Sequence, residues 1–135
     1  MRDLGAPCAI AGSGYGEGMP KLTPTSQSDA TLQVLADLPV TKEATTSRVL
    51  LNTPLMRVVT FAFDEGQVLT EHTSPRAVAC TVLHGTLRFV VDGTPYDMSA
   101  GDLVYLAPGA RHSVEATSPC HLQLVMVDTE APAES

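Results

Sequence analysis

Two histidines are the side chains in this sequence best suited to chemistry. His72 closes the segment Gly-Gln-Val-Leu-Thr-Glu-His that begins at Gly66, and His112 closes Gly-Asp-Leu-Val-Tyr-Leu-Ala-Pro-Gly-Ala-Arg-His, which begins at Gly101. Imidazole binds transition metals and changes its protonation near neutral pH. Two interpretations therefore compete: a metal site completed by water or a bound ligand, and a hydrogen-bonded histidine pair in a pocket without metal.

Glycines stand at fixed intervals around both histidines. The two segments resemble the paired signature motifs of the cupin superfamily, G-x5-H-x-H-x3-E-x6-G and G-x5-P-x-G-x2-H-x3-N. The matching positions are Gly66, His72 and Gly85 in the first motif and Gly101, Gly109 and His112 in the second. The resemblance covers roughly residues 45–127 and implies an all-β, single-domain cupin jelly-roll barrel, or double-stranded β-helix.

The sequence departs from the motifs at four positions. Ser74 replaces the second histidine, Val78 the glutamate and Ala116 the final asparagine, while Ala107 occupies the proline position just before Pro108. In cupins with the full set, three histidines and a glutamate bind a divalent metal. Only His72 and His112 remain here, and two imidazoles alone bind a metal weakly. The resemblance thus implies a reduced site, with one divalent ion (Mn, Fe, Ni or Zn) or none.

The elements around these residues are predicted to be strands. The apolar and β-branched runs are separated by turn residues at the spacing of a sandwich or barrel. The predicted strands cover residues 48–51, 56–63, 67–72, 77–83, 86–91, 94–98, 103–106, 112–116 and 122–127. Asp92-Gly93 predicts a type I′ hairpin turn. Leu32 to Leu38 is compatible with a short helix or a strand and is stopped by Pro39.

Strand alternation predicts what lines the pocket. The resemblance implies that His72, Ser74, Val78 and His112 line the pocket. If Val78 faces the interior, Cys80 and Val82 face it too, which adds Cys80 to the candidate pocket residues. Cys80 is expected to be a small buried hydrophobe, with a disulfide to Cys120 or a soft metal ligand as alternatives. The last strand should turn Leu122, Leu124 and Met126 inward and leave His121 outside. His84 is expected to be an exposed turn histidine, and Tyr105 a packing residue.

We expect mainly structural roles for the charged residues near the motifs. Glu71 should point away from the face that carries His72. Arg76 is a solvated surface arginine or, alternatively, contacts an anionic ligand at the opening, and the same choice applies to Arg111. Asp102 follows Gly101 and is expected to cap the turn.

The ends of the chain differ in composition from its centre. We expect a flexible N-terminal arm over residues 1–30, the cupin barrel over 31–127 and a polar tail over 128–135. The glycines between Gly12 and Gly18 lack the spacing and the preceding strand of a nucleotide-binding loop. Met19, in Met-Pro-Lys-Leu, is a candidate natural start.

Composition and charge limit the classes of partner. The chain has 135 residues and a net charge of −7, and its basic residues are scattered. Nucleic acid and anionic membranes are therefore not expected partners. Without a signal-peptide pattern or a run of roughly 20 apolar residues, the expected location is the cytoplasm.

The leading functional prediction is a small-molecule-binding cupin with a ligand between His72 and His112. One alternative is a metal-dependent enzyme of dioxygenase or isomerase type that uses these two histidines. Another is a sensor or interaction module without catalysis. The resemblance further implies a homodimer, for which Leu50-Leu51 and Val58-Val59 offer an apolar interface.

Overall fold

Residues 22–129 are described by the computed structural model, and in this part of the chain all regular structure is β. The nine strands are β1 (Thr45–Asn52), β2 (Met56–Phe63), β3 (Val68–His72), β4 (Ala77–His84), β5 (Thr86–Val91), β6 (Thr94–Ser99), β7 (Leu103–Leu106), β8 (His112–Ala116) and β9 (Cys120–Val127). Each coincides with a predicted strand to within three residues. The glycine-rich stretch, Met19 and residues 130–135 lie outside the described residues.

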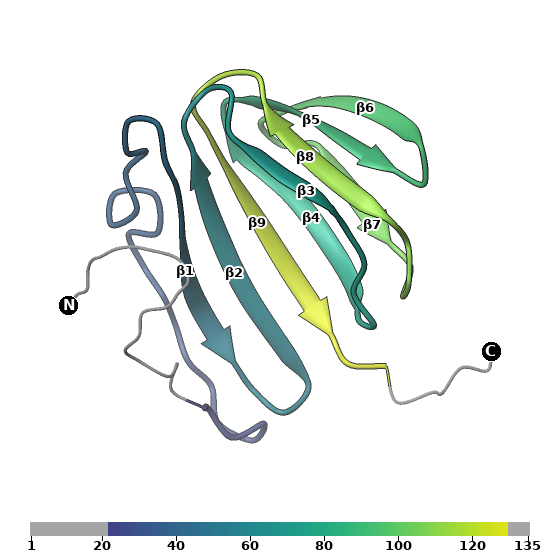
Figure 1. Ribbon diagram of the computed structural model, residues 1–135. Helices are drawn as coiled ribbons and strands as arrows, with labels where there is room; N and C mark the ends of the chain where they lie inside the picture. Colours follow the sequence, from purple (N-terminus) through teal and green to yellow (C-terminus); the bar gives the residue numbers. More distant parts are fainter. Residues whose placement is uncertain (1–21, 130–135) are drawn as a thin grey trace.

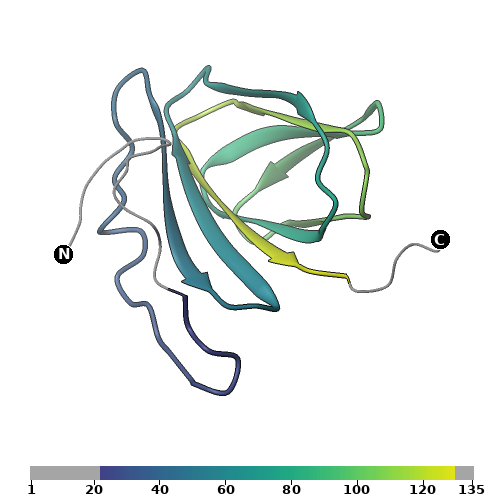
Figure 2. The same ribbon diagram turned by 60° about the horizontal axis from the view of Figure 1, so that its bottom comes forward.

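The strands form two facing sheets. One has five strands in the order β1-β2-β9-β4-β7, and the other has four in the order β3-β8-β5-β6 (Figure 1). All pairings are antiparallel, and chain neighbours repeatedly lie in opposite sheets. Seen along the sheets, the strands enclose a barrel (Figure 2). This is the predicted jelly-roll architecture.

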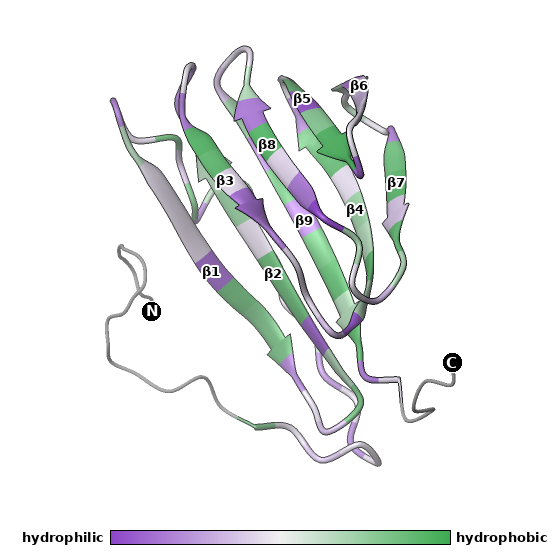
Figure 3. Cartoon of the chain, turned by 45° about the vertical axis from the view of Figure 1, so that its right-hand side comes forward, coloured by the Kyte–Doolittle hydropathy of each residue, from purple (hydrophilic) through white to green (hydrophobic). Residues whose placement is uncertain are grey.

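Alternation along the strands places the apolar core between the sheets. On β4, Val78, Cys80 and Val82 are buried, as the two-residue period predicts. Polar and apolar residues also follow one another along β8 (Figure 3). The core cluster comprises Phe63, Val78, Cys80, Val82, Leu87, Phe89, Met98, Leu106, Val114, Ala116, Cys120 and Leu122.

Two turns show why glycine stands where it does, one between the two motifs and one at the end of the first motif. Asp92 and Gly93 have φ angles of 47° and 85°, as a type I′ turn between β5 and β6 requires. Gly85 has φ +80°, and a Cβ there would lie 2.1 Å from the carbonyl oxygen of Pro119. The first motif therefore ends on glycine because the chain passes directly against the turn that leads into β9.

The segment from residue 22 to 44 forms turns, so Leu32 to Leu38 is neither the helix nor the strand considered above. It packs along the five-stranded sheet. The Thr23 amide donates to the carbonyl of Asn52 at 2.7 Å, and the Thr31 hydroxyl donates to that of Leu50 at 2.8 Å. Leu38 is buried. No helix in the described residues is long and apolar enough to cross a membrane.

Candidate functional site

His72 and His112 meet at one end of the barrel. His72 ends β3, His112 begins β8, and the two are directly paired across these strands. Their Nε2 atoms are 3.0 Å apart, and their ring centroids are 4.1 Å apart with an interplanar angle of 62°. His112 is buried beside Phe89, whereas His72 is exposed. The pair is thus open to solution on the His72 side.

Backbone carbonyls fix the orientation of both rings. Nδ1 of His72 lies 2.8 Å from the Thr70 carbonyl, and Nδ1 of His112 lies 3.1 Å from the Ala110 carbonyl. A carbonyl oxygen only accepts, so each Nδ1 carries the proton and donates it. The neutral form of each ring therefore keeps its lone pair on Nε2. The two lone pairs point into the same space.

Facing lone pairs cannot satisfy one another. A proton, a metal ion, or a hydrogen-bond donor from water or from a ligand has to lie between the Nε2 atoms for them to be paired. Burial lowers the pKa of His112, and His72 lowers it further, although the Ala110 carbonyl and Asp92 oppose this. His112 is consequently a neutral imidazole at physiological pH, which is the form that binds metals and accepts hydrogen bonds.

Two rows of residues face each other at this end of the barrel, which we call the mouth. The row in the larger sheet is Asn52, Arg57, Met126, Val78 and Leu106, and the row in the smaller sheet is His72, His112, Val91 and Thr94. The loop between His72 and Ala77 connects the rows. The Gly109 amide donates to the Ser74 carbonyl at 2.8 Å, joining the loops that carry the two motifs.

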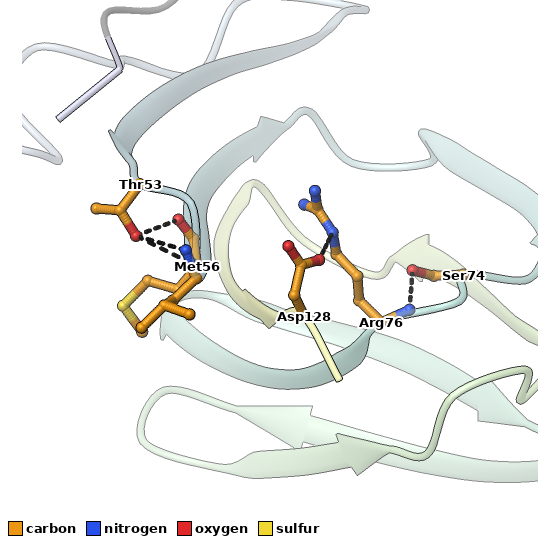
Figure 4. A network of polar contacts seen from close by, with 6 residues as sticks. Thr53, Met56, Ser74, Arg76 and Asp128 are labelled. Carbon is orange, nitrogen blue, oxygen red and sulfur yellow. Dashed lines mark hydrogen bonds and ion pairs between the residues drawn. The ribbon is translucent and has the colours of Figure 1, made fainter. Parts of the chain in front are cut away.

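The predicted pocket residues separate into three groups. His72, His112 and Val78 lie in the mouth rows. Ser74 lies in the connecting loop, where its hydroxyl accepts the Arg76 amide at 3.1 Å (Figure 4). Cys80 lies deeper, fully buried in the core, and burial raises the pKa of its thiol to about 12. A thiol held protonated in this way is a poor metal ligand.

The charged residues near the motifs have identifiable partners. The guanidinium of Arg76 forms an ion pair with Asp128 at 2.9 Å (Figure 4). Arg76 was the candidate contact for an anionic ligand at the opening, and here its anionic partner is Asp128. Glu71 and Arg111 are exposed. Asp102 accepts the Ser99 amide at 2.9 Å and so caps the turn between β6 and β7, as predicted.

A second histidine pair lies on the outer face of the larger sheet. His84 is exposed, as predicted, but its Nδ1 lies 3.1 Å from Nδ1 of His121. His121 does lie outside the barrel. It is nevertheless buried, because its Nε2 donates to the Leu38 carbonyl at 2.6 Å beneath the segment of residues 22–44. The alternation identified the face of His121 but gave no sign of what covers it.

The structure differs from the packing role expected for Tyr105 and from the disulfide considered between Cys80 and Cys120. Tyr105 is 61% exposed, so the prediction of a packing residue is wrong: β7 is an edge strand and Tyr105 is on its outer side. Cys80 and Cys120 are free, so the disulfide alternative is not realised. Cys80 pairs with Leu124, about 13 Å along the strand from Cys120.

Arg57 is the residue of the mouth that the sequence reasoning missed. The signal was nevertheless present: Phe61 and Phe63 fill the core from β2, and Arg57 shares their alternation.

The geometry of the histidine pair matches part of the metal site that the motifs imply. In residues 22–129, no group of three or more His, Cys, Asp or Glu side chains could hold an ion. Two imidazoles bound at adjacent positions of an octahedral ion, each about 2.1 Å from it, have nitrogens about 3 Å apart, and a tetrahedral ion would separate them by about 3.4 Å. The observed separation of 3.0 Å agrees with the octahedral arrangement. Donation of each Nδ1 proton to a carbonyl is also typical of metal-binding histidines. The residues present therefore supply two of the ligand positions of such a metal site, His72 and His112.

The family model of the cupin domain matches residues 59–128, just over half of the chain. The chain therefore belongs to the cupin family. No match was found among curated proteins.

Solved structures share the fold. The protein of unknown function SPY1581 from Streptococcus pyogenes is 24% identical with a TM-score of 0.70, covering 78% of this chain and 92% of that one. A cupin 2 conserved barrel domain protein from Leptotrichia buccalis is 27% identical with a TM-score of 0.66, covering 70% and 46%. KdgF from a Halomonas species is 21% identical with a TM-score of 0.60, covering 70% and 90%.

Proposed function

We propose that this cupin binds a small molecule at the mouth of its barrel, with the His72–His112 pair as the polar anchor. The observation that carries the proposal is the convergence of two Nε2 atoms at 3.0 Å, each on a ring whose Nδ1 is tied to a backbone carbonyl. Such a pair is incomplete without a partner. Because His72 is exposed, the partner is accessible from solution.

The apolar members of the mouth rows define the other half of the binding surface. Val78 and Leu106 are buried, and Met126 and Val91 are half-buried, all against the core cluster. Met126 and Val91 therefore offer accessible aliphatic surface beside the imidazoles, and Val78 and Leu106 close it from the core side. A ligand with one polar group and an apolar body is complementary to this combination.

A metal ion held by the same two histidines is the second candidate. The orientation of both rings by Nδ1 donation favours it. An ion bound there would supply Lewis acidity at positions left open to the small molecule. His72 and His112 would bind it through Nε2 and continue to donate their Nδ1 protons to the carbonyls, while Val78 and Leu106 would keep water from the inner side.

Metal content with histidine variants tests this anchor. Untagged protein is incubated separately with Mn, Fe, Ni and Zn, passed through a desalting column and analysed by mass spectrometry. Binding at the mouth predicts that His72→Ala and His112→Ala retain at least about tenfold less metal than wild type, since one imidazole of two is lost. His84→Ala is the matched control and should equal wild type. Equal metal in wild type and His72→Ala would rule out this metal site.

The small-molecule proposal has its own readout, independent of metal. Chelator-treated, ¹⁵N-labelled protein is titrated with a small molecule that can donate a hydrogen bond to imidazole, such as phenol. The histidine ring nitrogens are observed by NMR. We expect the Nε2 resonances of His72 and His112 to move together while those of His84 and His121 stay in place. Movement of all four histidines alike, or of none, would contradict the proposed anchor.

A further inference from the structure

Arg57 carries a buried charged donor that the described residues leave unpaired. Its Nε has no hydrogen-bond partner among them. The arginines found in ion pairs in that part of the chain are Arg48, Arg76 and Arg88, each with an aspartate. A guanidinium stays charged at any physiological pH, and a buried donor without a partner is unfavourable. Its retention at this position therefore requires an explanation.

The strand register places Arg57 on the inner face at the mouth. β2 pairs with β9 without irregularity from Met56 to Phe63, so the alternation that turns Phe61 and Phe63 into the core also turns Arg57 inward. Arg57 lies opposite Met126, which in turn lies opposite Val78. Side chains paired in this way share one face of a sheet. Arg57 thus belongs to the row that faces the two histidines.

The mouth rows carry a fixed positive charge in an otherwise acidic protein. They contain the guanidinium and two imidazoles and no carboxylate, although the chain as a whole has a net charge of −7. The acidic residue closest in sequence to the end of β9, Asp128, is paired with Arg76. Val78 occupies the position at which the cupin motif has glutamate. The fixed positive charge of Arg57 therefore suits an anionic group at the larger-sheet row of the mouth.

We propose that the small molecule bound at the mouth is a carboxylate with an apolar body, and that Arg57 recognises its carboxylate group. The guanidinium matches a carboxylate in geometry and charge, and Nε offers one of the donors needed. The apolar body would lie against Met126 and Val91, the accessible apolar members of the mouth rows. Because a carboxylate has no hydrogen atom to donate, a proton held between the two Nε2 atoms would complete the histidine pair. This inference rests on the proposed function, because it names the ligand class of the same site.

Benzoate and its uncharged amide, benzamide, form a matched pair of probes with the same apolar body. The full chain, labelled with ¹⁵N, is titrated with each while the Arg57 Nε–H resonance and the histidine ring nitrogens are observed. A charge-assisted contact predicts about tenfold or greater preference for benzoate. Arg57→Met should reduce the preference to near one. Arg57→Lys, which keeps the charge, should retain part of it.

A matched control separates this effect from a general change in charge. Arg48 lies on the outer face and pairs with Asp37 at 3.5 Å, so Arg48→Met should keep the full preference for benzoate. Equal affinity for the two probes, no binding of benzoate, or unchanged benzoate binding by Arg57→Met would each overturn the inference. Retained strand content in circular dichroism establishes that the variants are folded.

His72→Ala separates a failure of this inference from a failure of the proposed function. If His72→Ala weakens both probes while Arg57→Met leaves their ratio unchanged, the histidine anchor stands and the carboxylate inference falls. If His72→Ala has no effect on either probe while the preference still depends on Arg57, the proposed anchor fails and the carboxylate contact is supported.

Discussion

At the scale of single residues, two histidine pairs with similar distances differ in chemistry because of their backbone partners. In the mouth pair, each Nδ1 donates to a carbonyl and both Nε2 lone pairs remain. In the outer pair, His121 uses Nε2–H for Leu38, so His84 can donate its Nδ1 proton to Nδ1 of His121. The outer pair is satisfied by itself. The mouth pair requires something more, which is why we assign function there.

The loss of the motif glutamate can be reversed in this protein. Val78 is 2% exposed and lies in the mouth row, so Val78→Glu places a carboxylate beside two imidazoles. We expect Ni or Zn affinity to rise by about ten- to a hundredfold, because three protein ligands replace two. Without metal, the variant should unfold at a lower temperature, since the buried carboxyl is desolvated. Calorimetric titration gives the affinity, and an affinity equal to that of wild type would show that the ion binds elsewhere.

Gly85 should be intolerant of any side chain. An added Cβ would lie 2.1 Å from the Pro119 carbonyl oxygen and 2.7 Å from Cβ of Cys120, at a φ of +80°. Gly85→Ala should lower the free energy of unfolding by about 2–4 kcal/mol, combining the left-handed backbone with the steric overlap.

Gly101→Ala is the control for Gly85→Ala, and urea denaturation measures the free energy of unfolding of both variants. Gly101 has φ +94° but no atom within 4 Å of an added Cβ, so only the backbone effect of about 1–2 kcal/mol should remain. Equal losses for the two variants would argue against a steric role for Gly85.

At the scale of elements, the segment of residues 22–44 is attached to the sheet through a titratable contact. His121 joins it by donating to Leu38, and on the neighbouring strands the positions next to His121 are His84 and Ala62. Burial is the main cause that lowers the pKa of His121, His84 lowers it further, and the bond to Leu38 opposes them. The folded state therefore binds fewer protons at His121 than the unfolded chain does.

Acid should consequently weaken this attachment. A lowered folded-state pKa gives stability that is fully present above the ordinary value of about 6.5 and is lost as the pH falls through the folded value. We expect amide hydrogen exchange around Leu38 to accelerate at pH 5 relative to pH 7.5, while β4 and β9 remain protected. His121→Gln keeps a donor for Leu38 but does not titrate, so its exchange around Leu38 should not show this dependence. The same acceleration in both proteins would refute the role of His121.

The strands were largely predictable from the sequence, and the coverings of the sheets were not. Alternation predicted the inward face of β4, and Asp92-Gly93 predicted the hairpin between β5 and β6. Both predictions succeeded because they depend on local geometry. The burial of His121 and the exposure of Tyr105 depend on which segment covers which strand. That is decided by contacts between residues far apart in sequence, such as Leu38 with His121, which no local pattern encodes.

At the scale of the whole molecule, the jelly roll brings two motifs distant in sequence to one end of a barrel. The pairing of His72 with His112 was implied by the motif resemblance, because the two glycine frames fix where β3 ends and β8 begins. Arg57 lies outside both motifs and reaches the same end through the neighbouring sheet. The site is thus a combination of motif residues, which can be read from the sequence, and a residue that only the register of β2 and β9 locates.

At the mouth, we propose, the two Nε2 atoms converge as unprotonated ligands. The most direct test is a long-range ¹H–¹⁵N spectrum of the histidine rings, recorded at pH 7.5 during titration with Zn²⁺. We predict that His72 and His112 both carry their proton on Nδ1 and that both Nε2 resonances shift together at one equivalent. A proton on Nε2 in both free rings, or shifts at only one of them, would contradict this account.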